Sequence, residues 1–180
     1  MSLRIAVLAS AWVALGVVFA VSARLRLTVR HRSWTSLAGL AIQAFGFALA
    51  WMAYGADASD PRPPSGDWAI WIAAFIFALS VWLMAAAVRT LGRQWSLAAE
   101  IQTRHVLITG GPYAHTRHPI YVGMLGMLIG TALILTTLPR CVVAIAIYLA
   151  GTWIRVRQEE RLLREAFGDE YDEYKKRVRF

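Results

Sequence analysis

Charged residues are scarce in this 180-residue chain, at 17% of the total, whereas hydrophobic residues make up 58%. Soluble globular proteins carry about 25% charged and about 45–50% apolar residues. A chain this short keeps much of its surface exposed, so it cannot hide such an apolar excess in a water-facing fold. The composition therefore excludes a soluble enzyme and an intrinsically disordered protein.

Cysteine is almost absent as well: Cys141 is the single one and can form no internal disulfide, which excludes a disulfide-stapled secreted domain. The sequence has no GxGxxG motif, no Walker loop and no serine-centred hydrolase motif, which argues against a Rossmann-type cofactor site. Three histidines, His105, His115 and His118, lie close in sequence. No cysteine or suitably spaced carboxylate joins them, so a metal site is the weaker interpretation.

Long apolar runs dominate what is present, and about 20 such residues suffice to cross a membrane. The predicted spans are Leu3–Ala23, Trp34–Gly55, Trp68–Val88, Pro119–Leu138 and Cys141–Ile154. The last is short, so we expect it to continue through Arg155 or to lie tilted. We expect a tight turn at Leu138-Pro139-Arg140, because proline has no backbone N–H to donate. The fold class predicted is all-α: a polytopic membrane bundle of about five helices plus a C-terminal amphipathic cytoplasmic helix.

The basic residues indicate the orientation of these spans. Of the 19 lysines and arginines, 16 fall on one side if all five segments cross the membrane. Positive residues stay cytoplasmic, so the N-terminus is expected outside and the C-terminus inside. The net charge of +8 then indicates topology and contact with anionic lipid, rather than nucleic acid. The first span also resembles a signal peptide, but its length favours a retained helix.

The two halves of the chain differ in chemistry. Residues 1–88 are predicted to be a three-span membrane anchor. Residues 89–180 hold three of the four histidines and eight of the eleven acidic residues. We therefore place the cofactor-binding and catalytic region in residues 89–180.

The first candidate site is the polar stretch before the fourth predicted span. Residues 109–113 form a Thr-Gly-Gly-Pro-Tyr turn that brings backbone close to another element. Arg117 and His118 follow, and Pro119 suits the first turn of a helix. That helix start offers N–H groups and a positive dipole to a carboxylate or phosphate. The alternative is that Arg117 and His118 only anchor the span at the interface.

Three glycines, Gly123, Gly126 and Gly130, share one face of the fourth span. Small residues at this spacing let helices approach closely in lipid, so close packing is the default interpretation and a ligand contact the second.

The second candidate site begins where the fifth span ends. Arg155 and Glu159 are four residues apart, as are Glu160 and Arg164. Such pairs usually form a solvated face, but ionisable groups at the end of a span are costly and tend to be functional. The sequence Phe167-Gly168 predicts a helix stop. Beyond it, two tyrosines and a basic end predict an amphipathic helix on the membrane surface.

Taken together, these motifs resemble the isoprenylcysteine carboxyl methyltransferase family of integral membrane enzymes, which is related to phospholipid N-methyltransferases. The resemblance covers about the C-terminal half of the chain. The matching segments are Leu91–Ser96, His105–Ile108, Gly111–Tyr113, Arg117–Gly123, Glu159-Glu160 and Phe167–Tyr174.

The resemblance implies a methyltransferase that uses S-adenosylmethionine and acts on a small hydrophobic or lipid-tailed acceptor, such as an isoprenylcysteine carboxylate, which enters from the bilayer. It implies catalytic roles for Arg155, which would face the acceptor, and for Glu159 and Glu160. The implied cofactor-binding residues are His105, Val106, Leu107, Ile108, Tyr113, His118, Pro119, Tyr121 and Glu159. The small size of the chain, its short loops and its five predicted spans suggest a prokaryotic inner membrane protein, and the charge distribution suggests a cytoplasmic active site.

Alternatives stay open at this point. Relatives of the family methylate phospholipid amines or small thiols, and such acceptors would need a base such as Glu160 or His118. Membrane sterol reductases have a similar C-terminal region and bind NADPH. A non-catalytic membrane scaffold would tolerate exchange of Arg155 and Glu159.

Overall fold

The structure, a computed structural model, describes residues 3–23, 34–52, 67–92 and 106–178. In this part of the chain the elements are almost entirely helical. They are α1 (Leu3–Ala23), α2 (Trp34–Met52), α3 (Asp67–Leu91), the 3-10 turn η2 (Gly111–Ala114), α4 (Pro119–Leu135), α5 (Leu138–Phe167) and α6 (Asp169–Arg177). The predicted all-α fold is confirmed.

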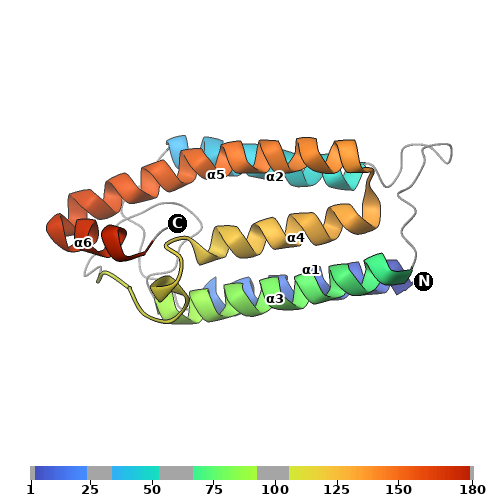
Figure 1. The fold of residues 1–180 in the computed structure, drawn as a ribbon, viewed down its shortest axis with the longest axis horizontal. Helices are drawn as coiled ribbons and strands as arrows, with labels where there is room; N and C mark the ends of the chain where they lie inside the picture. Colours follow the sequence, from blue (N-terminus) through green and yellow to red (C-terminus); the bar gives the residue numbers. More distant parts are fainter. Residues whose placement is uncertain (1–2, 24–33, 53–66, 93–105, 179–180) are drawn as a thin grey trace.

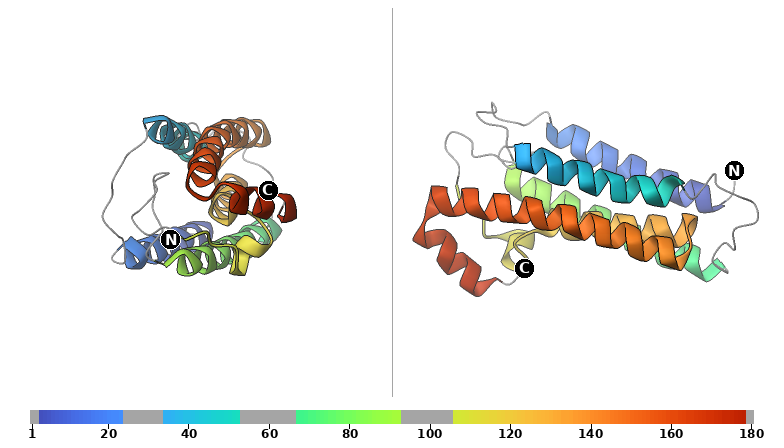
Figure 2. Two further views of the ribbon diagram at one scale, coloured as in Figure 1. Left: turned by 90° about the vertical axis from the view of Figure 1, so that its left-hand side faces the viewer. Right: turned by 90° about the horizontal axis from the view of Figure 1, so that it is seen from above.

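The five long helices run roughly parallel to one axis and form three layers (Figures 1 and 2). One layer holds α2 and α5, the opposite layer holds α1 and α3, and α4 lies between them. Successive helices alternate in direction, so the C-terminal ends of α1, α3 and α5 lie at the same end of the bundle as α6. This alternation is the arrangement expected if each helix crosses a bilayer.

Four of these helices are long and apolar enough to cross a membrane by length and composition: α1, α2, α3 and α5. The fifth, α4, is also apolar but has only 17 residues. Large apolar side chains such as Val13, Phe75 and Trp82 point outward and are 64–70% exposed. Lipid tails can cover such side chains at no cost, whereas water cannot, so the outer surface suits a membrane protein.

The predicted turn between the last two spans is wrong in its position. α4 ends at Leu135, and Leu138, Pro139 and Arg140 already form the first turn of α5. The connection is Thr136-Thr137, both in extended conformation. A proline near a helix start loses no hydrogen bond, because the first amides of a helix have no intrahelical partner. The prediction that the last span continues through Arg155 is confirmed, since α5 reaches Phe167.

The glycine stripe of α4 makes close contact with α3, as predicted. A Cβ on Gly123 would lie 2.5 Å from the Met84 side chain, and one on Gly130 would lie 2.6 Å from the Phe77 ring. A Cβ on Gly126 would collide with the hydroxyl of Ser80. The two helices can therefore approach closely only because these positions lack side chains.

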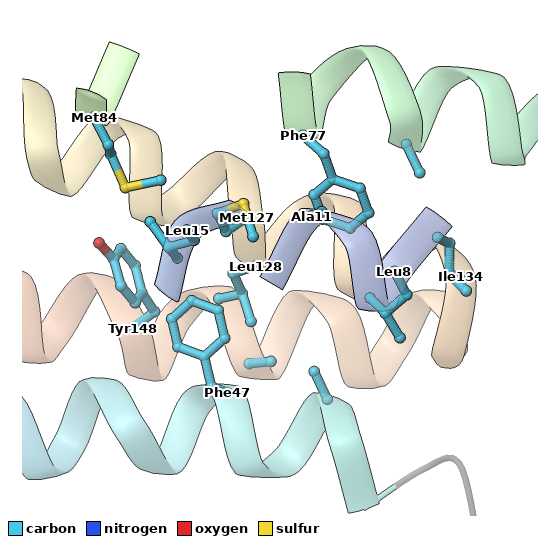
Figure 3. Packing of buried hydrophobic residues seen from close by; sticks show 13 residues of the cluster. Leu8, Ala11, Leu15, Phe47, Phe77, Met84, Met127, Leu128, Ile134 and Tyr148 are labelled. Carbon is cyan, nitrogen blue, oxygen red and sulfur yellow. The ribbon is translucent and has the colours of Figure 1, made fainter. Parts of the chain in front are cut away.

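The apolar core lies between the three layers (Figure 3). Leu128 and Met127 of α4 contribute from the middle layer, and both are fully buried. Phe47 of α2 packs edge-on against Tyr148 of α5 and against Trp12 of α1. The indole N–H of Trp12 donates to the Thr131 hydroxyl at 3.2 Å. This polar contact, the aromatic packing and the buried Leu8, Ala11 and Leu15 of α1 thus help to hold the helix in the bundle.

The helix stop at Phe167-Gly168 is confirmed, because Gly168 has a φ of +51° and α6 starts directly after it. In α6, Tyr171 and Tyr174 are buried against Leu107, Leu163 and Phe167. The aromatic face of the predicted amphipathic helix therefore packs on the protein itself, and these two tyrosines are not available to a membrane surface.

Candidate active site

A buried arginine, a tyrosine and a glutamate form a connected chain where α4 and α5 lie side by side. The Nε of Arg155 donates to the Tyr121 hydroxyl at 2.9 Å, and the guanidinium carbon lies 5.3 Å from the centre of the Tyr121 ring. The Tyr121 hydroxyl donates in turn to Glu159. Arg155 is only 5% exposed, whereas the Glu159 side chain is 28% exposed. The phenol thus links a buried cation to a partly exposed carboxylate, which reduces the cost of burying the charge.

The same arginine also contacts α2. Its Nη1 donates to Gln43 Oε1 at 3.4 Å, and the Gln43 amide donates to the Thr152 hydroxyl at 2.8 Å. Gln43 and Thr152 are both buried. A buried guanidinium needs acceptors, and a neutral amide supplies one without adding a second buried charge.

His118 lies between two adjacent glutamates of α5, Glu159 and Glu160. Its Nδ1 is 3.5 Å from Glu159, and its Nε2 is 3.5 Å from Glu160. Burial opposes protonation of the imidazole, but the two carboxylates outweigh it, so the pKa of His118 is raised from its ordinary value. The imidazole is therefore shifted toward the charged form, which matches the two negative partners.

Glu160 is more fully paired than Glu159. Arg117 Nη2 lies 2.9 Å from one carboxylate oxygen, and Lys175 of α6 donates to the other. Arg117 Nη1 also donates to the backbone carbonyl of Val178 at 2.8 Å, just beyond the end of α6. A cation at the C-terminal end of a helix is stabilising, because the last carbonyls lack intrahelical partners. These contacts tie α6 to α5 and to the loop before α4.

The loop before α4 closes the site from the other side. Gly111 has a φ of +59°, and a Cβ there would lie 2.8 Å from the Thr90 hydroxyl, so the predicted turn brings backbone against α3. Tyr113 is buried, and its carbonyl accepts from the Tyr174 hydroxyl at 2.7 Å. Burial, followed by the nearby charge of Glu159, raises the pKa of Tyr113, so its phenol stays neutral.

The structure brings together most of the residues predicted from the sequence. Arg155, Glu159, Glu160, His118 and Tyr121 form one continuous network. Tyr113 lies beside it, within electrostatic reach of Glu159. Pro119 begins α4 directly after His118.

The apolar run before the Gly-Gly turn is only partly described. Val106, Leu107 and Ile108 are extended, and Leu107 packs on the α6 tyrosines. His105 and residues 93–96 lie outside the described residues. No group of three or more His, Cys, Asp or Glu suited to a metal occurs in the described ranges.

Sequence reasoning missed two members of the network. Gln43 was visible as the single strongly polar residue of the second span, but nothing in the sequence indicated its partner. Lys175 was assigned to a basic tail on the membrane, whereas it pairs with Glu160. Likewise, Arg164 pairs with Asp172 of α6 at 2.6 Å, a contact that helical i,i+4 spacing could not indicate.

Comparison with known proteins shows to which family the segment with this network belongs. A family model described as phospholipid methyltransferase matches residues 68–170. The chain belongs to the phospholipid methyltransferase family. The matched residues contain every member of the Arg155–Tyr121–Glu159 chain, together with His118 and Glu160.

Curated relatives have more specific names. The chain is 36% identical over 102 residues to a protein-S-isoprenylcysteine O-methyltransferase of Tribolium castaneum, covering 53% of this chain and 35% of the relative. Relatives of the same name in Mus musculus and Homo sapiens are 39% and 40% identical over the same length, covering 53% of this chain and 35% and 34% of theirs. The chain thus spans about a third of the length of these relatives. Membership of this membrane methyltransferase family fits the apolar helices of the fold.

Proposed function

We propose that this chain is an integral membrane methyltransferase that moves a methyl group from S-adenosylmethionine to an acceptor resembling an isoprenylcysteine carboxylate. The observation that carries the proposal is the buried Arg155–Tyr121–Glu159 chain, which lies in the segment matched by the family and at the end of the bundle where α5 leaves the apolar layer. The names of the curated relatives support the same reaction class.

The residues of the site fit the chemistry of S-adenosylmethionine. Its ammonium and ribose hydroxyls need an acceptor, and Glu159 offers a partly exposed carboxylate. Its cationic sulfur is attracted to aromatic faces, and Tyr121 and Tyr113 lie next to that carboxylate. Val106, Leu107 and Ile108 would form a wall, together with His105, and the start of α4 at His118-Pro119 would complete it. When bound, the cofactor supplies an electrophilic methyl group on sulfur.

The charge state of the site favours an acceptor that arrives already deprotonated. A phospholipid amine or a thiol must lose a proton, so it needs a base near the reacting atom. The raised pKa of His118 shifts its imidazole toward the protonated form, and the charge of Glu160 is already matched by Arg117 and Lys175. A carboxylate needs no base. Arg155 would hold it by planar, paired donors, which is the geometry that suits carboxylates.

The acceptor would approach from the lipid side between helices, and the site would face the cytoplasm with the N-terminus outside. The ends of α1, α3 and α5 share one end of the bundle, which accords with this orientation. The assignment to a prokaryotic inner membrane stays a prediction.

The test is binding of S-adenosylhomocysteine to the detergent-purified protein by calorimetry, with Glu159→Gln as the variant and Glu165→Gln as the matched control. Glu165 is 54% exposed and pairs only with the exposed Arg161 in the described structure, so its variant is expected to bind like the wild type. Glu159→Gln is expected to bind at least tenfold more weakly, about 1.4 kcal/mol. NADPH is titrated in parallel.

Three results would contradict the proposal. NADPH binding without S-adenosylhomocysteine binding would favour a reductase-like protein. Binding of neither ligand to folded protein would favour a scaffold. Equal affinity of the wild type and Glu159→Gln for S-adenosylhomocysteine would show that Glu159 does not contribute to cofactor binding.

A further inference from the structure

One face of α2 carries a buried polar amide among small residues, although α2 lies outside the segment that the family model matches. Ser36, Gly39, Gln43 and Gly46 recur at spacings of three and four residues, and all four are buried. This face packs along α5. A helix serving only as a membrane anchor needs small residues for packing but gains nothing from a buried polar amide.

The two glycines of this face bring α2 against the backbone of α5. A Cβ on Gly39 would lie 2.9 Å from the carbonyl oxygen of Gly151 and 2.6 Å from the Cγ of Arg155. A Cβ on Gly46 would lie 2.9 Å from the carbonyl oxygen of Ala144. The stem of Arg155 therefore passes directly over Gly39, and any larger residue there would displace it.

A hydrogen bond to Thr152 fixes the orientation of the Gln43 side-chain amide. Its amide nitrogen donates to Thr152 at 2.8 Å, which turns its oxygen toward Arg155 Nη1. On the far side, Tyr121 accepts from the Nε of the same guanidinium. Two acceptors from α2 and α4 thus determine where the plane of the guanidinium lies, and a planar donor recognises a carboxylate only when its plane is correctly aligned.

We propose that Gln43 is a positioning residue for Arg155, and that α2 thereby forms a wall of the acceptor site and sets its preference for an anionic acceptor. This inference rests on the proposed function, in which Arg155 faces the acceptor. It adds that recognition of the acceptor depends on a helix outside the family match, whereas binding of the cofactor does not.

The experiment compares two probes: N-acetyl-S-farnesylcysteine, which has a free carboxylate, and its methyl ester, which lacks it. Binding of each to the full chain in detergent is measured by calorimetry, with and without saturating S-adenosylhomocysteine. The variants are Gln43→Leu and Gln43→Glu. Phe45→Leu, which alters a lipid-facing residue of α2 that is 57% exposed, is the control.

The wild type and Phe45→Leu are expected to bind the acid at least tenfold more tightly than the ester. Gln43→Leu is expected to lose most of this difference, because the guanidinium loses its acceptor on α2. Gln43→Glu is expected to lose it as well, because a carboxylate at this position competes with that of the probe. In both variants the affinities for the ester and for S-adenosylhomocysteine stay within twofold of the wild type, which a general loss of folding would not produce.

Equal affinity of the wild type for acid and ester, or no binding of either, would overturn the inference. Retained preference for the acid in both Gln43 variants would also overturn it. If Gln43→Leu does not fold, Gln43→Glu decides the outcome alone. If S-adenosylhomocysteine does not bind the wild type, the proposed function fails, and the acid–ester comparison on the ligand-free protein still tests the role of Gln43.

Discussion

The contact between α2 and α5 is close enough that a single methyl group should disturb it. In Gly151→Ala the added Cβ would lie 2.7 Å from the carbonyl oxygen of Gly39 and 2.9 Å from the backbone nitrogen of Gln43. Both neighbours are backbone atoms of a helix, so neither can move alone, and the helices must separate by several tenths of an ångström. Overpacking of this kind costs about 1–3 kcal/mol. Alanine returns about 0.5–1 kcal/mol through its better helix propensity.

The net destabilisation is therefore at most about 2.5 kcal/mol and is centred near about 1 kcal/mol. For a chain of this size, about 1 kcal/mol corresponds to a fall of roughly 2–4 °C in the midpoint of thermal unfolding. The assay is thermal unfolding in detergent, followed by helical circular dichroism at one fixed scan rate. Gly16→Ala is the matched control: it lies in α1, where an added Cβ meets nothing within 4 Å, so its midpoint should equal or slightly exceed that of the wild type. If Gly151→Ala is as stable as Gly16→Ala, α2 and α5 do not pack as described.

Three further outcomes are expected. Tyr121→Phe removes the hydroxyl between the buried guanidinium and the carboxylate and should weaken S-adenosylhomocysteine binding about tenfold by calorimetry. The Tyr148 hydroxyl donates to the backbone carbonyl of Tyr121 and also interacts with the Thr152 side chain, so Tyr148→Phe leaves the side-chain bonds of Tyr121 to Arg155 and Glu159 in place and should weaken binding far less. Equal losses would refute the role of the phenol. Glu160→Gln should speed tryptic cleavage in α6 about tenfold, because the side chain that pairs with Lys175 of α6 loses its charge. The control is Glu165→Gln. If Glu160→Gln is cleaved no faster than this control, the expectation is wrong. His118 has a raised pKa, so its stabilising contribution is complete below its ordinary pKa and is lost as the pH rises through the raised value. The unfolding midpoint of the wild type should therefore fall more steeply than that of His118→Asn as the pH rises above about 6.5, and parallel curves would refute this.

The helices themselves were predictable because their signals are local. The first helix has the predicted bounds Leu3–Ala23, α4 begins at Pro119, and α5 ends just before Gly168, two residues with special backbone preferences. The misplaced turn has a local reason too. Pro139 suits both a turn and the first turn of a helix, and sequence alone does not distinguish these positions when the true connection is only two residues long.

The site was predictable as a set of residues but not as an arrangement. Spacing indicated that Arg155 and Glu159 share a helix face, yet it gave no reason to place Tyr121 between them. It paired Glu160 with Arg164 on one helix, whereas in the folded chain Glu160 bonds to Arg117 and Lys175. Such partners lie 15 to 43 residues apart in sequence, and no periodicity extends across a chain reversal.

By itself, the sequence determined that this protein is a helical membrane bundle, because hydropathy, glycine spacing and charge distribution act over a few turns of helix. Only the tertiary structure decided that Glu159 is more exposed than Glu160, and that Gln43 of α2 contacts Arg155 of α5. The physical reason is that both depend on how helices far apart in sequence pack. A buried charged side chain can pair only with the polar groups that the fold brings within hydrogen-bond distance.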